Sequence, residues 1–240
     1  MDRRDSGFRY YDLLMALFVT VLIVSNIASA AKIVDWGLAL FGMRLAFDAG
    51  TLLFPVSYIF GDVLTEVYGY RRSRRVIWIG FACLGLTALV LWLVRVLPGE
   101  AAWEGYAGQE AYIQILGGIS SGGIVVASLL AYWAGEFANS FILARMKVMM
   151  DGRWLWARTI GSTIIGQAVD TLIFTLAATL LGVFPWEIFV SLILTNYLFK
   201  VTVEALMTPL TYLVVNRLKR VEREDFYDTN TNFNPFSSTL

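Results

Sequence analysis

Six long apolar segments, separated by short connections, dominate the pattern of hydrophobic and polar positions. They cover residues 12–34, 49–69, 76–97, 111–136, 158–182 and 187–216. Each is long enough to cross a hydrocarbon core of about 30 Å, which takes about 20 helical residues. The pattern therefore predicts an all-α membrane protein with six transmembrane helices. The last segment is longer than one crossing requires, so we expect it to tilt or to extend beyond the membrane.

The chain divides into a transmembrane domain, residues 1–220, and a polar tail, residues 221–240. The tail is rich in Asn, Thr, Ser and Asp and lacks an apolar period, so we expect an exposed and partly disordered end. The basic start and the small residues Ala28–Ala30 resemble a signal peptide with its cleavage site. The length of the apolar run favours a retained first span instead.

Basic residues gather in alternate connections and so predict the orientation. One side holds most of the 19 Lys and Arg residues: Arg3, Arg4, Arg9, Arg71, Arg72, Arg74, Arg75, Arg145, Lys147, Arg153, Arg158, Arg217, Lys219, Arg220 and Arg223. The opposite connections hold Arg44 and Arg95. Because cytoplasmic loops carry the excess of Lys and Arg, both termini are predicted to lie in the cytoplasm of a multi-pass inner-membrane protein.

Composition supports the membrane class and narrows the chemistry. The chain is 58% hydrophobic and 16% charged, whereas soluble domains carry about 25% charged residues. It has no histidine and one cysteine, Cys83, which excludes imidazole chemistry and an intramolecular disulfide. With no coherent nucleophile or metal set, we expect neither an enzyme nor a cofactor. The formal charge of zero gives no indication of a nucleic-acid partner.

Polar residues inside the apolar segments mark the candidate functional site. Asp62 and Glu66 are four residues apart, which places both carboxylates on one helix face. Gln167 and Asp170 are three apart. Side chains of this kind in a spanning helix face the bundle interior or a wet cavity. The final segment adds a strip at four-residue spacing: Asn196, Lys200 and Glu204.

Aromatic residues accompany these polar groups and suggest the type of ligand. Phe54 and Tyr58 continue the face of Asp62, and Tyr197 lies beside Lys200. Carboxylates, amides and a lysine beside aromatic rings suit a flat heterocycle with hydrogen-bond donors, such as a guanine-like edge. A bound cation is the alternative, but a carboxylate metal site needs neither the aromatics nor the lysines.

Structural roles for the same residues stay open. Asp62 or Glu66 can pair with Lys32 or Lys200, and Lys200 can be the counter-ion of Glu204. Asn26 and Asn196 can bond between packed helices, and Lys32 can extend to the outer interface. The arginines at 71–75 are typical of a topology anchor. The acids outnumber the interior lysines, however, so some carboxylate must be protonated, hydrated or bound to a ligand.

Several short motifs are distributed along the chain. The most specific is Asp62-x-x-Thr65-Glu66-x-Tyr68-Gly69 with the arginines after it, preceded by Phe54-Pro55-x-x-Tyr58. The others are Ser25-Asn26-Ile27 with Lys32, Gln167-x-x-Asp170-Thr171, Lys200, and the Asn-Phe-Asn-Pro-Phe tail at 232–236. Together these motifs resemble the queuosine-precursor transporter family, also called the vitamin uptake transporter family, and the resemblance covers nearly the whole chain.

The resemblance implies an importer of the 7-deazaguanine precursors of queuosine, 7-cyano-7-deazaguanine (preQ0) and 7-aminomethyl-7-deazaguanine (preQ1). It also implies a fold similar to the substrate-binding components of energy-coupling-factor transporters, and a homodimer among membrane lipids. Alternatives are a carrier for another nucleobase or vitamin, or a substrate-binding subunit that needs a separate ATPase. The energy source and the preferred precursor stay open.

The candidate substrate-binding residues lie on four of the six segments. They are Asn26, Lys32, Phe54, Tyr58, Asp62, Glu66, Gln167, Asp170, Asn196, Tyr197 and Lys200. Glu66 and Glu204 are candidates for proton coupling, because only carboxylates can carry protons in a chain without histidine.

Overall fold

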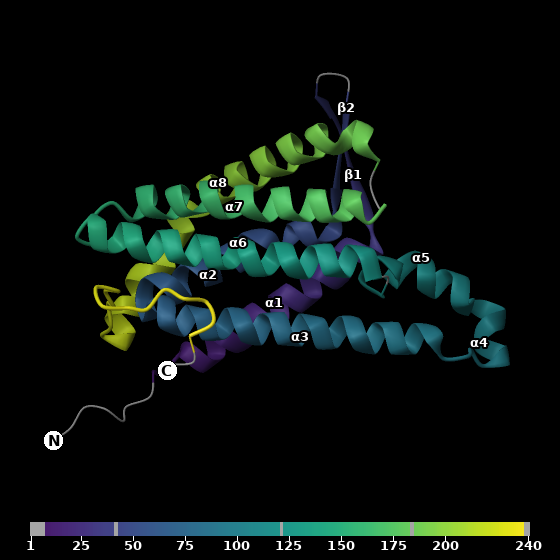
Figure 1. Ribbon diagram of the computed structural model, residues 1–240, viewed down its shortest axis with the longest axis horizontal. Coiled ribbons are helices and arrows are strands. Elements are labelled where there is room, and N and C mark those ends of the chain that lie inside the picture. The colour runs from purple at the N-terminus through teal and green to yellow at the C-terminus, as the bar shows by residue number, and fades with distance from the viewer. Residues whose placement is uncertain (1–7, 41–42, 121, 183–184, 238–240) are drawn as a thin grey trace.

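The fold is a bundle of long helices, seen in a computed structural model that describes residues 8–40, 43–120, 122–182 and 185–237 (Figure 1). The long helices are α1 (Tyr11–Ala31), α3 (Tyr70–Val96), α6 (Gly122–Met149), α7 (Leu155–Leu180) and α8 (Phe189–Glu222). The shorter ones are α2 (Phe54–Tyr68), α4 (Ala101–Tyr106) and α5 (Gly108–Ser120), and 3-10 turns cover Ala49–Leu52 and Trp186–Ile188.

Five helices within the described part of the chain are long and apolar enough to cross a membrane. The predicted second span is shorter than expected, because α2 has only 15 residues and rises about 22 Å. Pro55 lies in its first turn, and Gly69 ends it with a φ of +85°, a value that L side chains rarely adopt. The prediction of six full-length spans is therefore not confirmed.

The predicted fourth span, residues 111–136, is placed differently in the structure. The described part of this run comprises α5, which ends at Ser120, and α6, which begins at Gly122, and the membrane-length segment is Val125–Met149. This shift moves Glu136 from the expected end of a span to its middle.

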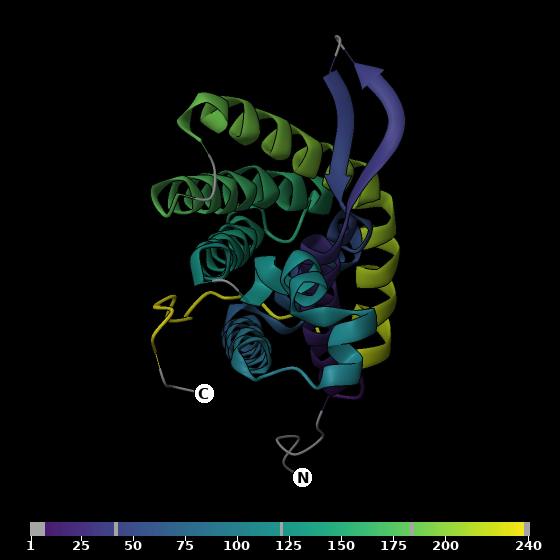
Figure 2. The same cartoon turned by 90° about the vertical axis from the view of Figure 1, so that its right-hand side faces the viewer.

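A β-hairpin interrupts the helical pattern between α1 and α2. Strand β1 (Ile33–Leu40) pairs antiparallel with β2 (Met43–Asp48), with Ile33 opposite Asp48 and Leu40 opposite Met43. The hairpin projects sideways from the bundle, across the direction of the long helices and past α7 and α8, in Figures 1 and 2. The sequence pattern predicted only a connection here, although β-branched and aromatic residues of this segment favour strands.

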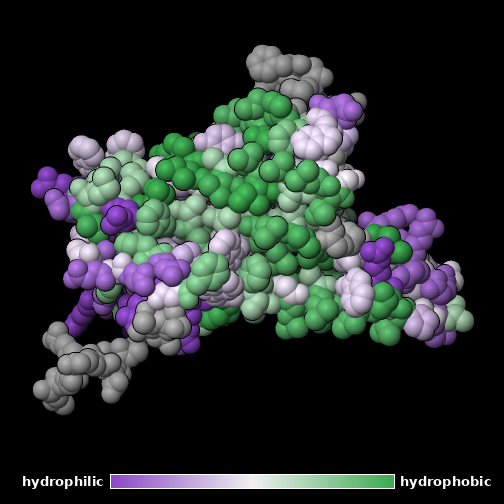
Figure 3. Space-filling view, viewed as in Figure 1, coloured by the Kyte–Doolittle hydropathy of each residue, from purple (hydrophilic) through white to green (hydrophobic). Residues whose placement is uncertain are grey.

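The ends of the elements alternate between the two ends of the bundle. The start of α1, the α2–α3 junction, the α6–α7 turn and the end of α8 meet at one end, with both termini beside them (Figure 1). A broad hydrophobic band separates hydrophilic ends in Figure 3. The structure thus agrees with both termini on one side of a membrane, while the cytoplasmic assignment of that side stays a prediction.

Helix α8 is long enough to extend beyond one crossing, and Figure 2 shows that it bends along its length. Pro209 lies inside it and removes one backbone hydrogen bond, which is the usual cause of such a bend. The bend lets one helix contact both α7 and α2.

Helices α6 and α7 pack as a close antiparallel pair through glycines. A Cβ added at Gly135 would lie 2.7 Å from the Asp170 Cβ, and one added at Gly166 would lie 2.8 Å from the Asn139 Cβ. Side chains larger than glycine would hold the helices apart. The approach brings Asn139 and Asp170, on opposite helices, into one region.

Gly135→Ala should therefore lower the free energy of unfolding by about 1–3 kcal/mol, because the added methyl group would be too close to the Cβ and Cα of Asp170 on α7. Gly85→Ala is the matched control, since its Cβ would meet nothing within 4 Å and the change should be neutral or stabilise α3 by up to about 1 kcal/mol. Thermal unfolding of both variants in one detergent measures the difference. Equal melting temperatures would show that the close contact is dispensable.

The C-terminal tail packs against the bundle rather than extending into solvent. Arg74 donates to the carbonyls of Asn232 and Asn234, at 3.1 and 2.8 Å, and the Trp78 indole donates to that of Pro235 at 2.9 Å. The Phe233 ring lies against Tyr70 and Phe141, and that of Phe236 against Trp78 and Trp133. The expectation of an exposed tail holds for many of its side chains, Phe236 among them at 68% exposed, while the contacts above position residues 223–237 against the bundle.

Candidate functional site

A cluster of polar side chains occupies the middle of the bundle, where α2, α6, α7 and α8 meet. Asp62 of α2 is 1% exposed and accepts a hydrogen bond of 3.2 Å from the Asn139 Nδ2 of α6. Glu204 of α8 is 5% exposed and accepts from the Thr163 hydroxyl of α7. Two buried carboxylates from different helices thus have neutral partners.

Glu136 adds a third carboxylate from α6. Its Oε2 would lie 3.3 Å from a Cβ on Gly61, so the absence of a side chain at Gly61 leaves room for it beside α2. Glu136 and Glu204 each lie within electrostatic range of Asp62 and of one another. Among the described residues, none of these three carboxylates forms an ion pair.

Two amide side chains of this region have oxygens without a partner. Asn139 Oδ1 and Gln167 Oε1 are buried, and each lacks a hydrogen-bond donor within the part of the chain that the structure describes. An unpaired buried acceptor costs about 1–3 kcal/mol. The cluster therefore has more acceptors than donors, and a ligand rich in N–H groups would satisfy it.

Asp170 and Lys200 form an ion pair at the edge of the cluster. The Lys200 Nζ lies 2.5 Å from the Asp170 Oδ2, and both side chains are about one-fifth exposed. The sequence left open a pair of Lys200 with Glu204; in the structure Lys200 pairs with Asp170, and Glu204 accepts a hydrogen bond from Thr163. Helical spacing favoured the intrahelical pair, but the close approach of α7 brings Asp170 to the same lysine.

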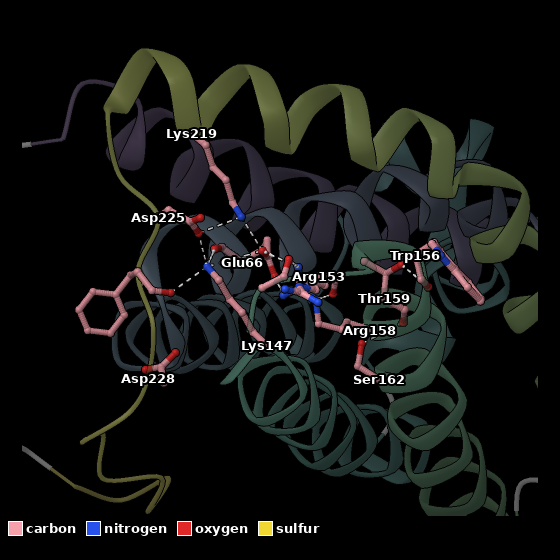
Figure 4. Close-up of polar contacts among 12 residues, drawn as sticks. Glu66, Lys147, Arg153, Trp156, Arg158, Thr159, Ser162, Lys219, Asp225 and Asp228 are labelled. Atoms are coloured by element: carbon pink, nitrogen blue, oxygen red, sulfur yellow. Dashed lines mark hydrogen bonds and ion pairs between the residues drawn. The ribbon is translucent and has the colours of Figure 1, made fainter. Parts of the chain in front are cut away.

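Glu66 lies one turn beyond Asp62 and belongs to a different assembly, an ion network at the end of the bundle where the termini meet (Figure 4). Arg158 binds both Glu66 oxygens, with Nη1 at 2.6 Å from Oε2 and Nη2 at 3.1 Å from Oε1. Lys219 Nζ donates to Oε1 at 2.6 Å, and Lys147 Nζ donates to the Glu66 backbone carbonyl at 2.6 Å. Glu66, Lys147 and Arg158 are each at most 1% exposed.

The tail completes this network. Asp225 accepts from Lys147 and lies 2.8 Å from Lys219, and the Phe226 carbonyl accepts from Lys147 at 2.8 Å. The network therefore joins α2, α6, α7, α8 and the tail, as Figure 4 shows. The network closes the end of the bundle that holds the start of α1 and the end of α8, one helical turn from Asp62 of the central cluster.

The surroundings of Asp225 predict that docking of the tail depends on pH. Burial opposes its ionisation, but the hydrogen bonds and charges of Lys147 and Lys219 outweigh burial and hold its pKa below the ordinary 3.8. A depressed pKa stabilises the docked state above pH 3.8, and this stabilisation is lost as the pH falls through the lowered pKa. The Phe226 amide, which donates to the Val67 carbonyl, reports on docking.

We expect hydrogen exchange at the Phe226 amide, corrected for its intrinsic pH dependence, to accelerate several-fold in acid below this pKa. Asp225→Asn should exchange at that faster rate already at pH 7, while Glu224→Gln, one residue away, should behave as the unaltered protein. An Asp225→Asn variant with unchanged protection at pH 7 would show that Asp225 does not hold the tail.

No hydrogen bond or ion pair among the described residues joins Asn26, Lys32, Asn196 or Tyr197 to the cluster. Asn26 donates to its own helix at the Leu22 carbonyl, 2.8 Å away, and Lys32 is exposed where α1 ends. Asn196 is exposed on α8, and the neighbouring Tyr197 donates to the Ile164 carbonyl at 3.2 Å. Phe54 and Tyr58 lie on α2, but their side chains fall outside the described part of the structure.

Sequence reasoning missed the contributions of α6 and of three basic residues. Asn139 and Glu136 were given no binding role because the fourth span was placed too early in the chain. Arg158, Lys147 and Lys219 were interpreted only as charges that mark one side of the membrane. The signal that could have found them is the need of Glu66 for buried cations, since an unpaired buried charge is strongly unfavourable.

The arrangement is that of a helical membrane protein with a buried, acceptor-rich interior and one end closed by ion pairs. No group of three or more acidic or cysteine residues suited to hold a metal ion is found in the described ranges. Such an interior suits a carrier that encloses a small polar molecule.

Comparisons with known proteins agree with this class. The family model described as "Putative vitamin uptake transporter" matches residues 48–214, so the chain belongs to the vitamin uptake transporter family. A "Probable queuosine precursor transporter" of Bacillus subtilis (strain 168) is 28% identical over 188 residues, which cover 77% of each chain. One of the same description from Haemophilus influenzae is 24% identical over 168 residues, covering 69% of this chain and 67% of that protein. No solved structure matches significantly.

Proposed function

We propose that this protein imports 7-deazaguanine precursors of queuosine, preQ0 and preQ1, across the bacterial inner membrane. The family supports a transporter, and the two relatives carry the description of queuosine precursor transporters. The observation that carries the proposal is the excess of acceptors in the central cluster. Among the residues that the structure describes, Asp62 and Glu204 have no cationic partner, and Asn139 and Gln167 each present an unpaired oxygen.

A 7-deazaguanine base has the complementary set of groups. Its N1–H and exocyclic amino group can donate side by side to the two oxygens of one carboxylate, and we assign this role to Asp62. Its remaining ring N–H can donate to Glu204 or to the Gln167 oxygen, while an amide NH₂ donates to its carbonyl. Hydrogen bonds to a charged group contribute about 1.5–3 kcal/mol, so the carboxylate provides most of the selectivity.

The ion network around Glu66 defines the state of the carrier in this proposal. With positive charge on the cytoplasmic side, the network end faces the cytoplasm, and the structure corresponds to a state closed on that side. Release of the base then requires separation of α7 and α8 from Glu66. We assign any proton coupling to Glu204 rather than Glu66, because Glu66 is neutralised by Arg158 and Lys219.

Supplying a precursor to cells and measuring queuosine in their tRNA tests the proposal. A bacterial strain that neither makes nor imports 7-deazaguanines should regain queuosine in its tRNA when it expresses this protein and receives nanomolar preQ0 or preQ1. An empty vector is the control. If queuosine does not return although the protein is in the membrane, the substrate is another nucleobase or vitamin. The homodimer and the likeness to energy-coupling-factor components stay predictions of the resemblance.

A further inference from the structure

Helix α7 carries a line of buried hydroxyl groups beyond the central cluster. Thr171, Thr175 and Thr179 follow Gln167 at four-residue spacing and are 2%, 1% and 4% exposed. None of their hydroxyl oxygens has a hydrogen-bond partner in the described structure. We call these three residues, with Gln167, the α7 polar stripe.

The missing partners are unusual because a helical threonine has one available on its own helix. Thr163 of α7 and Thr208 of α8 are bonded in this way or to a neighbouring acid. Threonine normally bonds the carbonyl three or four residues earlier, and in a membrane an orphan hydroxyl finds no water to replace it. The three stripe threonines do not make this bond to the preceding carbonyl, so their hydroxyls can bond to water or to a ligand.

The stripe leads from the cluster to the end of the bundle opposite the ion network. Thr163 lies near the network end at Glu204, and Thr179 lies 16 residues later, about 24 Å along the helix. Helix α6 runs antiparallel to α7 through Gly135 and Asp170, so the start of α6 lies near Thr179. Ser120, just before α6, is also buried with an unpaired hydroxyl.

The geometry points to the α7 polar stripe as one wall of an access route to the central cluster. A polar heterocycle and water molecules would enter along this route from the side of the membrane opposite the ion network. In the present state the route is closed and the hydroxyls are orphaned. When α7 separates from its neighbours, water or the passing base supplies their hydrogen bonds. The unpaired hydroxyls on this face thus lower the free energy needed to separate α7 from its neighbours, because they gain hydrogen bonds to water or to the base when the route opens.

This inference rests on the proposed transport function and is tested by cysteine accessibility. In a Cys83→Ala background, Thr171→Cys, Thr175→Cys and Thr179→Cys are exposed to a charged, membrane-impermeant thiol reagent from either side of the membrane. The matched controls are Leu172→Cys and Leu176→Cys, which lie on the outward face of the same helix at 49% and 38% exposed. Each variant is first shown to reach the membrane in its folded form.

We expect at least tenfold faster modification at the stripe than at Leu172 or Leu176, from the side opposite the network, with Thr179 faster than Thr171. Modification no faster than at the leucines, from either side, would overturn the inference. Saturating preQ0 should slow modification at Thr171. Fast modification without such protection would support the route and contradict the proposed substrate, so the two proposals fail separately.

Thr175→Val separates transport from folding, because it removes the orphan hydroxyl and keeps the shape of the side chain. The melting temperature should stay equal or rise, since no hydrogen bond is lost. Uptake should fall several-fold. Uptake at the original rate in this variant would contradict a role of the hydroxyl in the route.

Discussion

Glu66→Ala should reduce the free energy of unfolding by about 3–5 kcal/mol, the largest stability change expected for one side chain in this protein. The substitution leaves Arg158 and Lys147 buried without the carboxylate that they share, and each is only 1% exposed. Removing one partner of a buried ion pair has this large effect because the remaining charge keeps its desolvation cost. Thermal or denaturant unfolding in detergent measures it.

Two controls connect this loss to the network. Glu187→Ala removes an exposed carboxylate and should leave stability unchanged within about 0.5 kcal/mol. The double variant Glu66→Ala with Lys219→Met should recover part of the loss, since it removes one of the unpaired cations. If Glu66→Ala is as stable as Glu187→Ala, the ion pairs do not hold this end of the bundle together.

Asp62→Asn should lower precursor uptake by about 10- to 100-fold while the protein remains folded. The amide keeps one acceptor but turns an NH₂ group toward the donors of the guanine-like edge, so the paired charge-assisted bonds are lost. Their contribution of about 1.5–3 kcal/mol corresponds to that range. Initial rates of preQ0 uptake at matched membrane expression give the result.

Asp151→Asn is the matched control for Asp62→Asn. Asp151 lies exposed in the α6–α7 turn with a φ of +50°, a conformation that asparagine also tolerates. This change should leave uptake unaltered. Normal uptake by Asp62→Asn would remove Asp62 from substrate recognition and leave Glu204 and Gln167 as the groups to test.

The central polar positions could be predicted from the sequence, because a charged side chain in a membrane-spanning helix is unfavourable in contact with lipid and therefore faces the bundle interior. Asp62, Gln167 and Glu204 were expected inside the bundle and are buried there. Their partners could not be predicted from helical spacing alone. A pair of Lys200 with Glu204 was one open alternative, whereas Lys200 binds Asp170, because the approach of two helices decides the contact and not the spacing along one.

The network and the tail were beyond sequence reasoning for a related reason. Long basic side chains in loops look alike whether they face solvent or reach inward, so Arg158 and Lys147 were interpreted only as topology signals. The tail residues Phe233 and Phe236 were visible in the sequence, yet only the folded bundle shows their partners. Phe233 packs against Tyr70 and Phe141, and Phe236 packs against Trp78 and Trp133. The hairpin was missed because residues 35–48 were assigned to a connection between two spans, and strand pairing inside that connection was not considered.

Uptake of labelled preQ0 into liposomes that contain only the purified protein tests the central claim most directly. We predict saturable uptake, inhibited by unlabelled preQ1 and largely abolished by Asp62→Asn. An excess of 7-deazaadenine should not inhibit uptake, because this base lacks the adjacent N1–H and amino donors. Absence of protein-dependent uptake, or equal competition by 7-deazaadenine, would contradict recognition of a guanine-like edge by the buried cluster.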